Sequence, residues 1–269
     1  MTKQLIHTLN LNNRGVLSLI GAGGKTSLMF RLAKELTLTG KTVLTTTTTK
    51  IFMPTQDQSP ETVIAGSFEE LVKRSESSLN RYHHFSAGSR CDLSTGKLIG
   101  FTPDIIDLLW QTSLFDWIIV EADGAGQKPL KATGPHEPVV PRVTSHLILV
   151  TGLDALGLPL DDDYVHRAKL FSKNTGLAMG KTVDEQSIAT SINIEIKKVF
   201  AVNPHLIKIV FLNKADTKDR IISAQKIGNL LQYPTPISRI ITASLKDEIP
   251  VKHCFTIHPT KQKTKNLIS

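Results

Sequence analysis

The stretch Leu17-Ser18-Leu19-Ile20-Gly21-Ala22-Gly23-Gly24-Lys25-Thr26-Ser27 decides the fold of this chain. A short apolar run leads into a glycine-rich turn, and a lysine and two hydroxyl residues follow directly ahead of an amphipathic segment. Glycines let the backbone curl so that its N–H groups converge on an anion, and a helix that starts there adds its positive N-terminal end. The stretch therefore predicts a strand, a phosphate-binding loop and a helix in immediate succession.

The residues of this loop have distinct expected roles. Lys25 would reach the outer phosphates of a nucleotide, and Thr26 would ligate magnesium. The residues expected to bind the nucleotide here are Gly21, Ala22, Gly23, Gly24, Lys25, Thr26 and Ser27. Only the shorter form G-x-x-G-K-[ST] is satisfied, because the eight-residue form requires glycine where this chain has Leu19. The alternative is a turn that binds nothing, which a cation in the first turn of a helix disfavours.

Composition sets outer bounds on the class of protein. The 269 residues are 40% apolar and 21% charged, which suits one large α/β domain with embellishments. The net charge of +8 is spread along the chain, with a local excess only at Lys252 and the lysines of 261–265, so we expect no nucleic-acid partner. Cys91 and Cys254 form no metal or disulfide motif, and no segment has the length of a leader or membrane span. We expect a cytoplasmic protein without a membrane partner.

Apolar runs alternate with helical segments along the chain. Besides the strand before the loop, strands are expected near 42–45, 62–65, 82–87, 97–100, 116–121, 146–150, 206–212 and 237–242. Helices are expected directly after the loop and near 67–79, 102–113, 184–199 and 217–231. This alternation predicts an α/β fold with a doubly wound, mostly parallel sheet of the P-loop nucleoside triphosphatase type. Residues 1–245 are expected to form a single P-loop domain with inserted loops and a short hairpin near 82–100, and residues 246–269 a basic polar C-terminal tail.

Five threonines, Thr45 to Thr49, precede Lys50 where the second strand ends. Branched β-carbons favour strands, so one interpretation is a strand end of good propensity. The other places several hydroxyls and Lys50 beside the phosphate site, as ligands for magnesium or a substrate oxyanion. The sequence leaves both interpretations open.

Two acids follow the apolar strand 116–121 immediately. Open α/β sheets place ligand-binding residues where such strands end, and Glu121 and Asp123 would share a face of a regular strand. In a phosphate-loop protein an acid there holds magnesium or orients an attacking water. The candidate catalytic residues are therefore Lys25, Glu121 and Asp123, and the candidate magnesium ligands are Thr26, Glu121 and Asp123. The alternative is a polar turn whose acids face solvent.

A further apolar strand ends in the motif N-K-x-D at Asn213, Lys214 and Asp216. An aspartate can accept two hydrogen bonds from guanine, an asparagine can donate to the base, and a lysine stem can cover it. The segment 242–244 resembles the small residues that complete a guanine pocket. The alternative is that Asp216 or Thr217 caps the next helix.

Two polar clusters lie between these motifs. His136 and Glu137 stand in a proline-stiffened loop that could supply an acid/base pair or close over a substrate, and a run of aspartates leads to His166 and Arg167. Surface loops and helix caps explain both clusters equally well.

Seven segments together resemble the YqeC family of accessory proteins for selenium-dependent hydroxylases: GAGGKTS, LTTTTTKI, GKLIG, VEADGAGQKPLKA, HEPVVP, TGLDALGLPLDDDYVHR and LNKAD. The resemblance covers roughly residues 14 to 245 and implies a P-loop α/β fold associated with the maturation of molybdenum-containing hydroxylases. The positions that match functional motifs are Gly21, Gly24, Lys25, Thr26, Glu121, Asp123, Asn213 and Asp216. His136, Glu137, His166 and Arg167 match family segments without an assigned chemistry.

The combined expectation is a protein that binds and hydrolyses a nucleoside triphosphate, ATP or GTP with Mg²⁺, during hydroxylase maturation. Its partner would be a molybdenum hydroxylase or the molybdopterin cofactor. One alternative is an ATP-dependent phosphotransferase or ligase acting on a small anionic substrate, since the shortened loop is similar to that of cell-wall amide ligases. Another is a non-catalytic carrier of the molybdenum cofactor.

Overall fold

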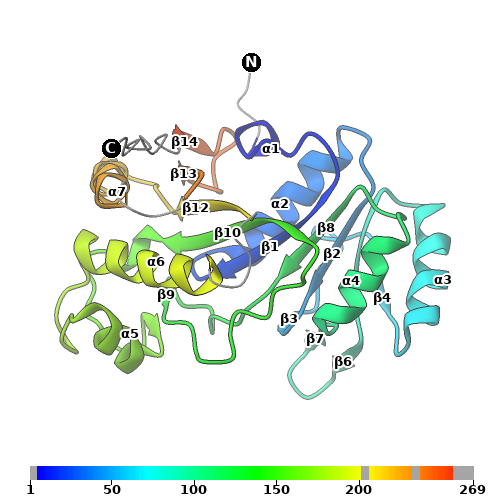
Figure 1. The fold of residues 1–269 in the computed structure, drawn as a ribbon, viewed down its shortest axis with the longest axis horizontal. Helices are drawn as coiled ribbons and strands as arrows, with labels where there is room; N and C mark the ends of the chain where they lie inside the picture. The colour runs from blue at the N-terminus through cyan, green and yellow to red at the C-terminus, as the bar shows by residue number, and fades with distance from the viewer. Residues whose placement is uncertain (1–4, 201–205, 232–236, 257–269) are drawn as a thin grey trace, which may run out of the picture.

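The computed structural model describes residues 5–200, 206–231 and 237–256. Its centre is a nine-stranded sheet in which every neighbouring pair is parallel except β13 and β14 (Figure 1). In spatial order the strands are β14 (Val251–Thr256), β13 (Arg239–Ala243), β12 (Ile207–Asn213), β10 (Thr144–Gly152), β1 (Gly15–Gly21), β8 (Trp117–Glu121), β2 (Val43–Thr47), β5 (His84–Gly88) and β4 (Thr62–Ile64). The predicted doubly wound α/β fold is confirmed.

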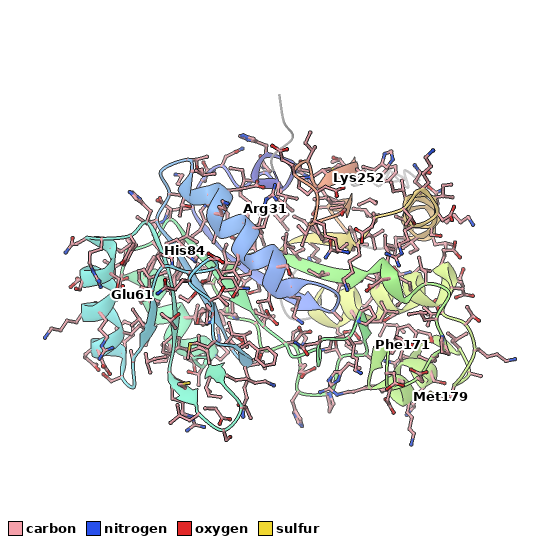
Figure 2. The ribbon with its side chains drawn as sticks, turned by 180° about the vertical axis from the view of Figure 1, so that it is seen from behind. Arg31, Glu61, His84, Phe171, Met179 and Lys252 are labelled. Atoms are coloured by element: carbon pink, nitrogen blue, oxygen red, sulfur yellow. The ribbon has the colours of Figure 1, made fainter. Side chains whose placement is uncertain are left out.

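Helices cover both faces of this sheet. They are α1 (Leu5–Thr8), α2 (Lys25–Thr37), α3 (Phe68–Leu79), α4 (Pro103–Gln111), α5 (Ala168–Thr175), α6 (Glu185–Phe200) and α7 (Lys218–Leu230), with a short 3-10 turn η1 (Leu153–Ala155). In Figure 1, α4 and α6 lie in front of the sheet, whereas Figure 2, seen from behind, shows α2 in front of it. Within the described ranges, no helix combines the length and the apolar character needed to cross a membrane.

Strand β1 shows why the sheet forms. All seven of its residues are buried, as expected for a central parallel strand covered on both faces. Val16 and Ile20 point into one hydrophobic cluster, and Leu17 and Leu19 point into the other. Alternate side chains of β1 thus pack into the two hydrophobic cores on opposite faces of the sheet. Strand β1 lies at the centre of the sheet, between β8 and β10, so the loop that follows it begins there.

Two small sheets stand apart from the main one. The segment near 82–100 differs from the expected hairpin, because its first part, β5, joins the main sheet beside β2. The hairpin is made instead by β6 (Arg90–Asp92) and β7 (Lys97–Ile99), and β7 also pairs with β3 (Lys50–Phe52). Two-residue strands β9 (Leu130–Lys131) and β11 (Val165–His166) form the other small sheet.

The C-terminal region differs from the expected tail over residues 251–256. These residues form β14, which pairs antiparallel with β13 and closes one edge of the sheet. Val251 is buried at that edge, and Lys252 pairs with Asp247. Lys246 is described as well, whereas the lysines of 261–265 lie outside the described residues.

Candidate functional site

The loop between β1 and α2 requires its glycines. Gly21, Gly23 and Gly24 have φ angles of +91°, +83° and +124°, where side chains are strained. A Cβ on Gly21 would stand 2.2 Å from the carbonyl oxygen of Val150. The helix begins at Lys25, so its free N–H groups face the loop at the carboxyl edge of the sheet.

Lys25 is held over the loop by Glu121, which ends β8, and by Asp123 two residues later. Its Nζ donates to the carbonyl oxygen of Gly21 at 2.6 Å and lies 3.0 Å from Asp123 Oδ1 and 3.7 Å from Glu121 Oε1. Burial alone would lower the pKa of Lys25, but the two carboxylates outweigh it and raise that pKa above its ordinary value. The lysine is therefore a permanent cation at the position expected for the outer phosphates.

Glu121 and Thr26 bring two oxygens to one point. Thr26 Oγ1 donates to Glu121 Oε2 at 2.6 Å, and both residues line the cavity above the loop. Burial raises the pKa of Glu121, so a cation beside it would be favoured. Mg²⁺ is commonly held by one or two protein oxygens together with phosphates and water, and this pair fits that chemistry. In the described part of the chain, no group of three His, Cys, Asp or Glu side chains could hold a metal by itself.

Asp123 is fully enclosed, unlike Glu121. Its Oδ2 accepts from the N–H of Gly21 and from Lys131 Nζ, both at 2.9 Å. The side chain has no exposed surface and does not line the cavity. The two acids therefore share Lys25 but differ in access, and Asp123 joins the loop to Lys131.

Lys131 is a site residue that the sequence prediction missed. It lies on β9, is 2% exposed, and donates to Asp123 Oδ2, to the carbonyl oxygen of Gly124 and to Glu137 Oε2. The apolar neighbours Leu130 and Ala132 were the available signal, since a lysine between buried residues needs a partner. Lys25, Glu121, Asp123 and Lys131 are called the buried ion cluster below.

The cluster continues to the surface through Glu137. Arg167 NH1 lies 2.7 Å from Glu137 Oε2, and its NH2 donates to Oε1 at 3.2 Å. Burial would raise the pKa of Glu137, but Arg167 and Lys131 hold it at about 2. Burial, with Arg167 and Lys131 nearby, lowers the pKa of His166. His136, predicted together with Glu137, lines a second cavity of 780 Å³, and Glu137 lies in the wall of this cavity too.

A cavity of 520 Å³ opens above the loop. Five lysines and two glutamates are among the residues in its wall: Lys25, Lys50, Lys97, Lys128, Lys214, Glu121 and Glu137. The remaining wall comes from Gly23, Gly24, Thr26, Ser27, Thr49, Ile51, Phe52 and 124–127. The excess of positive charge suits an anionic ligand.

The N-K-x-D motif lies beside the loop. Asn213 Nδ2 donates to the carbonyl oxygen of Gly23 at 2.8 Å, which ties the end of β12 to the phosphate loop. Asp216 Oδ1 accepts from Ser244 Oγ at 2.7 Å, and Lys246 Nζ lies 3.4 Å from its Oδ2. Asn213, Lys214, Asp216, Ser244 and Lys246 are called the base-side cluster below. Only Lys214 among them lines the cavity.

Lys214 and the helix start complete this region. Lys214 Nζ lies 2.6 Å from Asp154 Oδ2, and its backbone has a φ of 63°. The cap of α7 is Thr217, whose side chain accepts from the N–H of Arg220. Asp216 is therefore not the capping residue and keeps its carboxylate for Ser244, Lys246 and any ligand.

Each of the two interpretations of the threonine run holds for a part of it. Thr45, Thr46 and Thr47 are buried, and Thr47 Oγ1 donates to the carbonyl oxygen of Glu121 at 2.7 Å. Thr49 and Lys50 line the cavity above the loop. The strand residues are thus structural, and only the end of the run reaches the site.

Two comparisons of sequence find known proteins to which this chain is similar. Residues 17–169 match the family model described as YqeC protein. The YqeC protein of Escherichia coli (strain K12) is 38% identical over 174 residues, which are 62% of this chain and 63% of that protein. The match therefore spans less than two thirds of the length of this relative.

Solved structures with similar folds are far more distant in sequence. Chloroplast FtsY from Physcomitrella patens is 15% identical, with a TM-score of 0.43 over 89% of this chain and 63% of that chain. The hydrogenase maturation factor HypB from Archaeoglobus fulgidus is 13% identical, with a TM-score of 0.42 over 89% of this chain and 86% of that chain. The P-loop fold is carried by this chain's own features: the parallel sheet, the glycine loop after β1 and the acids after β8.

Proposed function

The chain belongs to the YqeC family, and from that premise we propose that it binds and hydrolyses a Mg²⁺-nucleoside triphosphate as an accessory protein in the maturation of selenium-dependent molybdenum hydroxylases. One observation carries the nucleotide part of the proposal. Lys25 stands at the start of α2, above a glycine loop, with the Thr26–Glu121 oxygen pair beside it. This arrangement offers a cation, amide donors and magnesium ligands to one polyphosphate.

Each residue has a role in this proposal. Lys25 and the N–H groups of Gly24 and Ser27 bind the phosphates, whereas the N–H groups of Gly21, Ala22 and Gly23 donate to Asp123, Val150 and Lys128 and shape the loop. Thr26 and Glu121 hold Mg²⁺, which neutralises charge on the phosphates when bound. Asp123 is a positioning residue, because it is enclosed and fixes both Lys25 and the N–H of Gly21. This assignment leaves Glu121 as the acid that faces the reacting phosphate.

We assign guanine as the preferred base. Asn213 is bonded to the loop, so a base next to it would lie in register with phosphates over the loop. Asp216 has both oxygens near donors and lies at the surface, where guanine's N1–H and amine could replace the contact with Lys246. Lys214 lines the cavity between base and phosphates. GTP is therefore the expected substrate, and ATP the weaker ligand.

Titration with fluorescent GTP and ATP analogues, with and without Mg²⁺, tests the proposal. Lys25→Ala is expected to weaken Mg²⁺-GTP binding at least about 100-fold, since charge-assisted bonds contribute roughly 1.5 to 3 kcal/mol each. Lys34→Ala removes an exposed lysine from the same helix and serves as the matched control. Thr26→Ala should bind nucleotide with reduced dependence on Mg²⁺. Equal binding by wild type and by a folded Lys25→Ala protein would refute the proposal.

The maturation role rests on the family resemblance and needs its own experiment. In a host whose own gene is deleted, wild-type protein should restore activity of a selenium-dependent molybdenum hydroxylase, and Lys25→Ala should not. Restoration by both proteins would separate the role from nucleotide binding. Full hydroxylase activity in the deleted host would refute the role itself.

A further inference from the structure

The cavity above the phosphate loop extends away from the base-side cluster. The C-terminal ends of five neighbouring strands, β12, β10, β1, β8 and β2, lie in this order along the sheet. The base-side cluster follows β12, the loop follows β1, and Glu121 ends β8. Strands are spaced about 4.8 Å apart, so β2 lies roughly 19 Å from β12. A nucleotide laid from base to magnesium therefore ends near β8 and leaves the part of the cavity beyond it unfilled.

Strands β3 and β7 of the three-stranded sheet β3–β7–β6 form the wall of that part. Ile51 and Leu98 face the protein core and fix the sheet in place. Lys50 and Phe52 alternate with Ile51 and so share the opposite face, and Lys97 is paired directly with Phe52. Lys50, Phe52 and Lys97 line the cavity together with Ile51, which places two cations and a half-exposed aromatic ring in the same cavity wall as the phosphate loop.

The lysines of this wall have little negative charge to balance them. Lys97 Nζ lies over the ring of Phe52, 5.2 Å from its centre, and has no ion pair with any carboxylate in the described ranges. Lys50 has one long contact, 3.9 Å to Asp92 Oδ2. From the neighbouring loop, Lys128 donates to the carbonyl oxygen of Asp163, which leaves its charge unneutralised. Lys50 and Lys97 thus face the part of the cavity beyond β8, and Lys128, whose carbonyl oxygen accepts from the N–H of Gly23, stands at the phosphate loop next to it.

We propose that Lys50, Lys97 and Lys128 form a second anion site, for a small carboxylate- or phosphate-bearing ligand that binds next to the terminal phosphate of the nucleotide. The site rests on the proposed function, because the nucleotide forms one of its walls. Phe52 covers the ligand's apolar part, and the lysines bind its anionic groups. The protein is then a two-ligand enzyme or carrier in which nucleotide and anion are bound side by side.

A chemical-shift titration of the ¹⁵N-labelled, nucleotide-loaded protein tests this site. The protein is first saturated with Mg²⁺ and guanosine 5′-(β,γ-imido)triphosphate, which fills the phosphate loop, and nucleotide affinity is measured separately. Inorganic phosphate and succinate are then titrated in parallel. We expect at least one of them to bind saturably and to shift amide signals of residues 50–52 and 97–99. Which of the two binds tells phosphate from carboxylate recognition.

Matched double variants decide whether the lysines carry the binding. Lys50→Ala/Lys97→Ala should weaken anion binding at least about tenfold, whereas Lys73→Ala/Lys169→Ala, which removes two exposed lysines elsewhere, should not. The inference fails if neither anion binds, if both double variants bind equally, or if nucleotide affinity falls as far as anion affinity. If wild type does not bind the nucleotide at all, the proposed function fails and this site fails with it.

Discussion

The buried ion cluster and the base-side cluster flank the same loop but differ in their access to water. In the buried ion cluster the side chains of Lys25, Asp123 and Lys131 are 3%, 0% and 2% exposed. In the base-side cluster Asn213 and Ser244 are buried as well, but the charged side chains of Lys214, Asp216 and Lys246 are 34%, 23% and 80% exposed. Removing one partner of a buried pair leaves an uncompensated charge, whereas an exposed pair is replaced by water. We infer that the first cluster, together with the buried Asn213, sets the loop geometry and that the exposed charged side chains of the second are free to select a ligand.

The same Asp→Asn change in the two clusters tests this difference most strongly. Asp123→Asn removes the charge that Lys25 and Lys131 share, so it should lower the free energy of unfolding by about 3 to 5 kcal/mol. Asp216→Asn should lower it by less than about 1 kcal/mol. Urea denaturation followed by circular dichroism measures both. Equal effects would show that the clusters do not differ in the way their burial indicates.

The stability of the protein should depend on pH through buried histidines that have no ion-pair partner in the described part of the chain. His84 lies on β5, beside Thr45, and burial lowers its pKa to about 4. Because the unfolded chain takes up the proton first, stability falls as the pH drops from about 6.5 toward 4, by about 2 kcal/mol at pH 5. Burial lowers the pKa of His146 to about 4 as well.

Unfolding at pH 7.5 and pH 5 measures this dependence. His84→Gln should reduce the loss of stability between the two pH values, and His83→Gln, at the exposed neighbouring position, should leave it as in wild type. An unchanged pH dependence in His84→Gln would contradict the assignment. Lys25 itself should contribute nothing in this window, because its raised pKa keeps it charged throughout.

Base selection is the function expected of the exposed Asp216 in the base-side cluster. Asp216→Asn should weaken GTP binding about tenfold and leave ATP binding nearly unchanged, because an amide cannot accept both guanine donors. Asp219→Asn, which changes an exposed acid in the first turn of α7, is the control. Competition of GTP and ATP for a labelled analogue gives the ratio. A parallel loss of both nucleotides would show that Asp216 supports the fold of the site rather than the choice of base.

Local sequence patterns predicted the parts of the molecule that local physics determines. The loop, the helix after it and the buried strand ending at Glu121 each carry their own signal of glycines, periodicity or continuous apolar residues. The N-K-x-D residues were likewise found at a strand end, as β12 shows. Their mutual placement follows from parallel strands that end at one edge of the sheet.

The missed parts depend on pairing between distant short segments. Strands β9 and β11 have two residues each, too few for a periodic pattern, yet their pairing brings Arg167 to Glu137. Lys131 was missed for the same reason, since its partners Asp123 and Glu137 are set by the folded chain. Strand β14 was taken for part of a tail because its outer residues are polar, as is usual on an edge strand.

The smallest effect is expected at the surface end of the chain of ion pairs, at Arg167. Arg167→Gln removes a partly exposed pair with Glu137, so the free energy of unfolding should fall by less than about 1 kcal/mol. The pKa of Glu137, now about 2, should rise but stay below its ordinary value, because Lys131 remains 2.8 Å away. A ¹³C titration of the glutamate carboxyl measures that pKa, and Arg74→Gln, which removes an exposed pair with Glu70, is the control. An unchanged pKa would mean that Lys131 alone holds Glu137 charged, and the influence of the buried ion cluster would then reach the surface without Arg167.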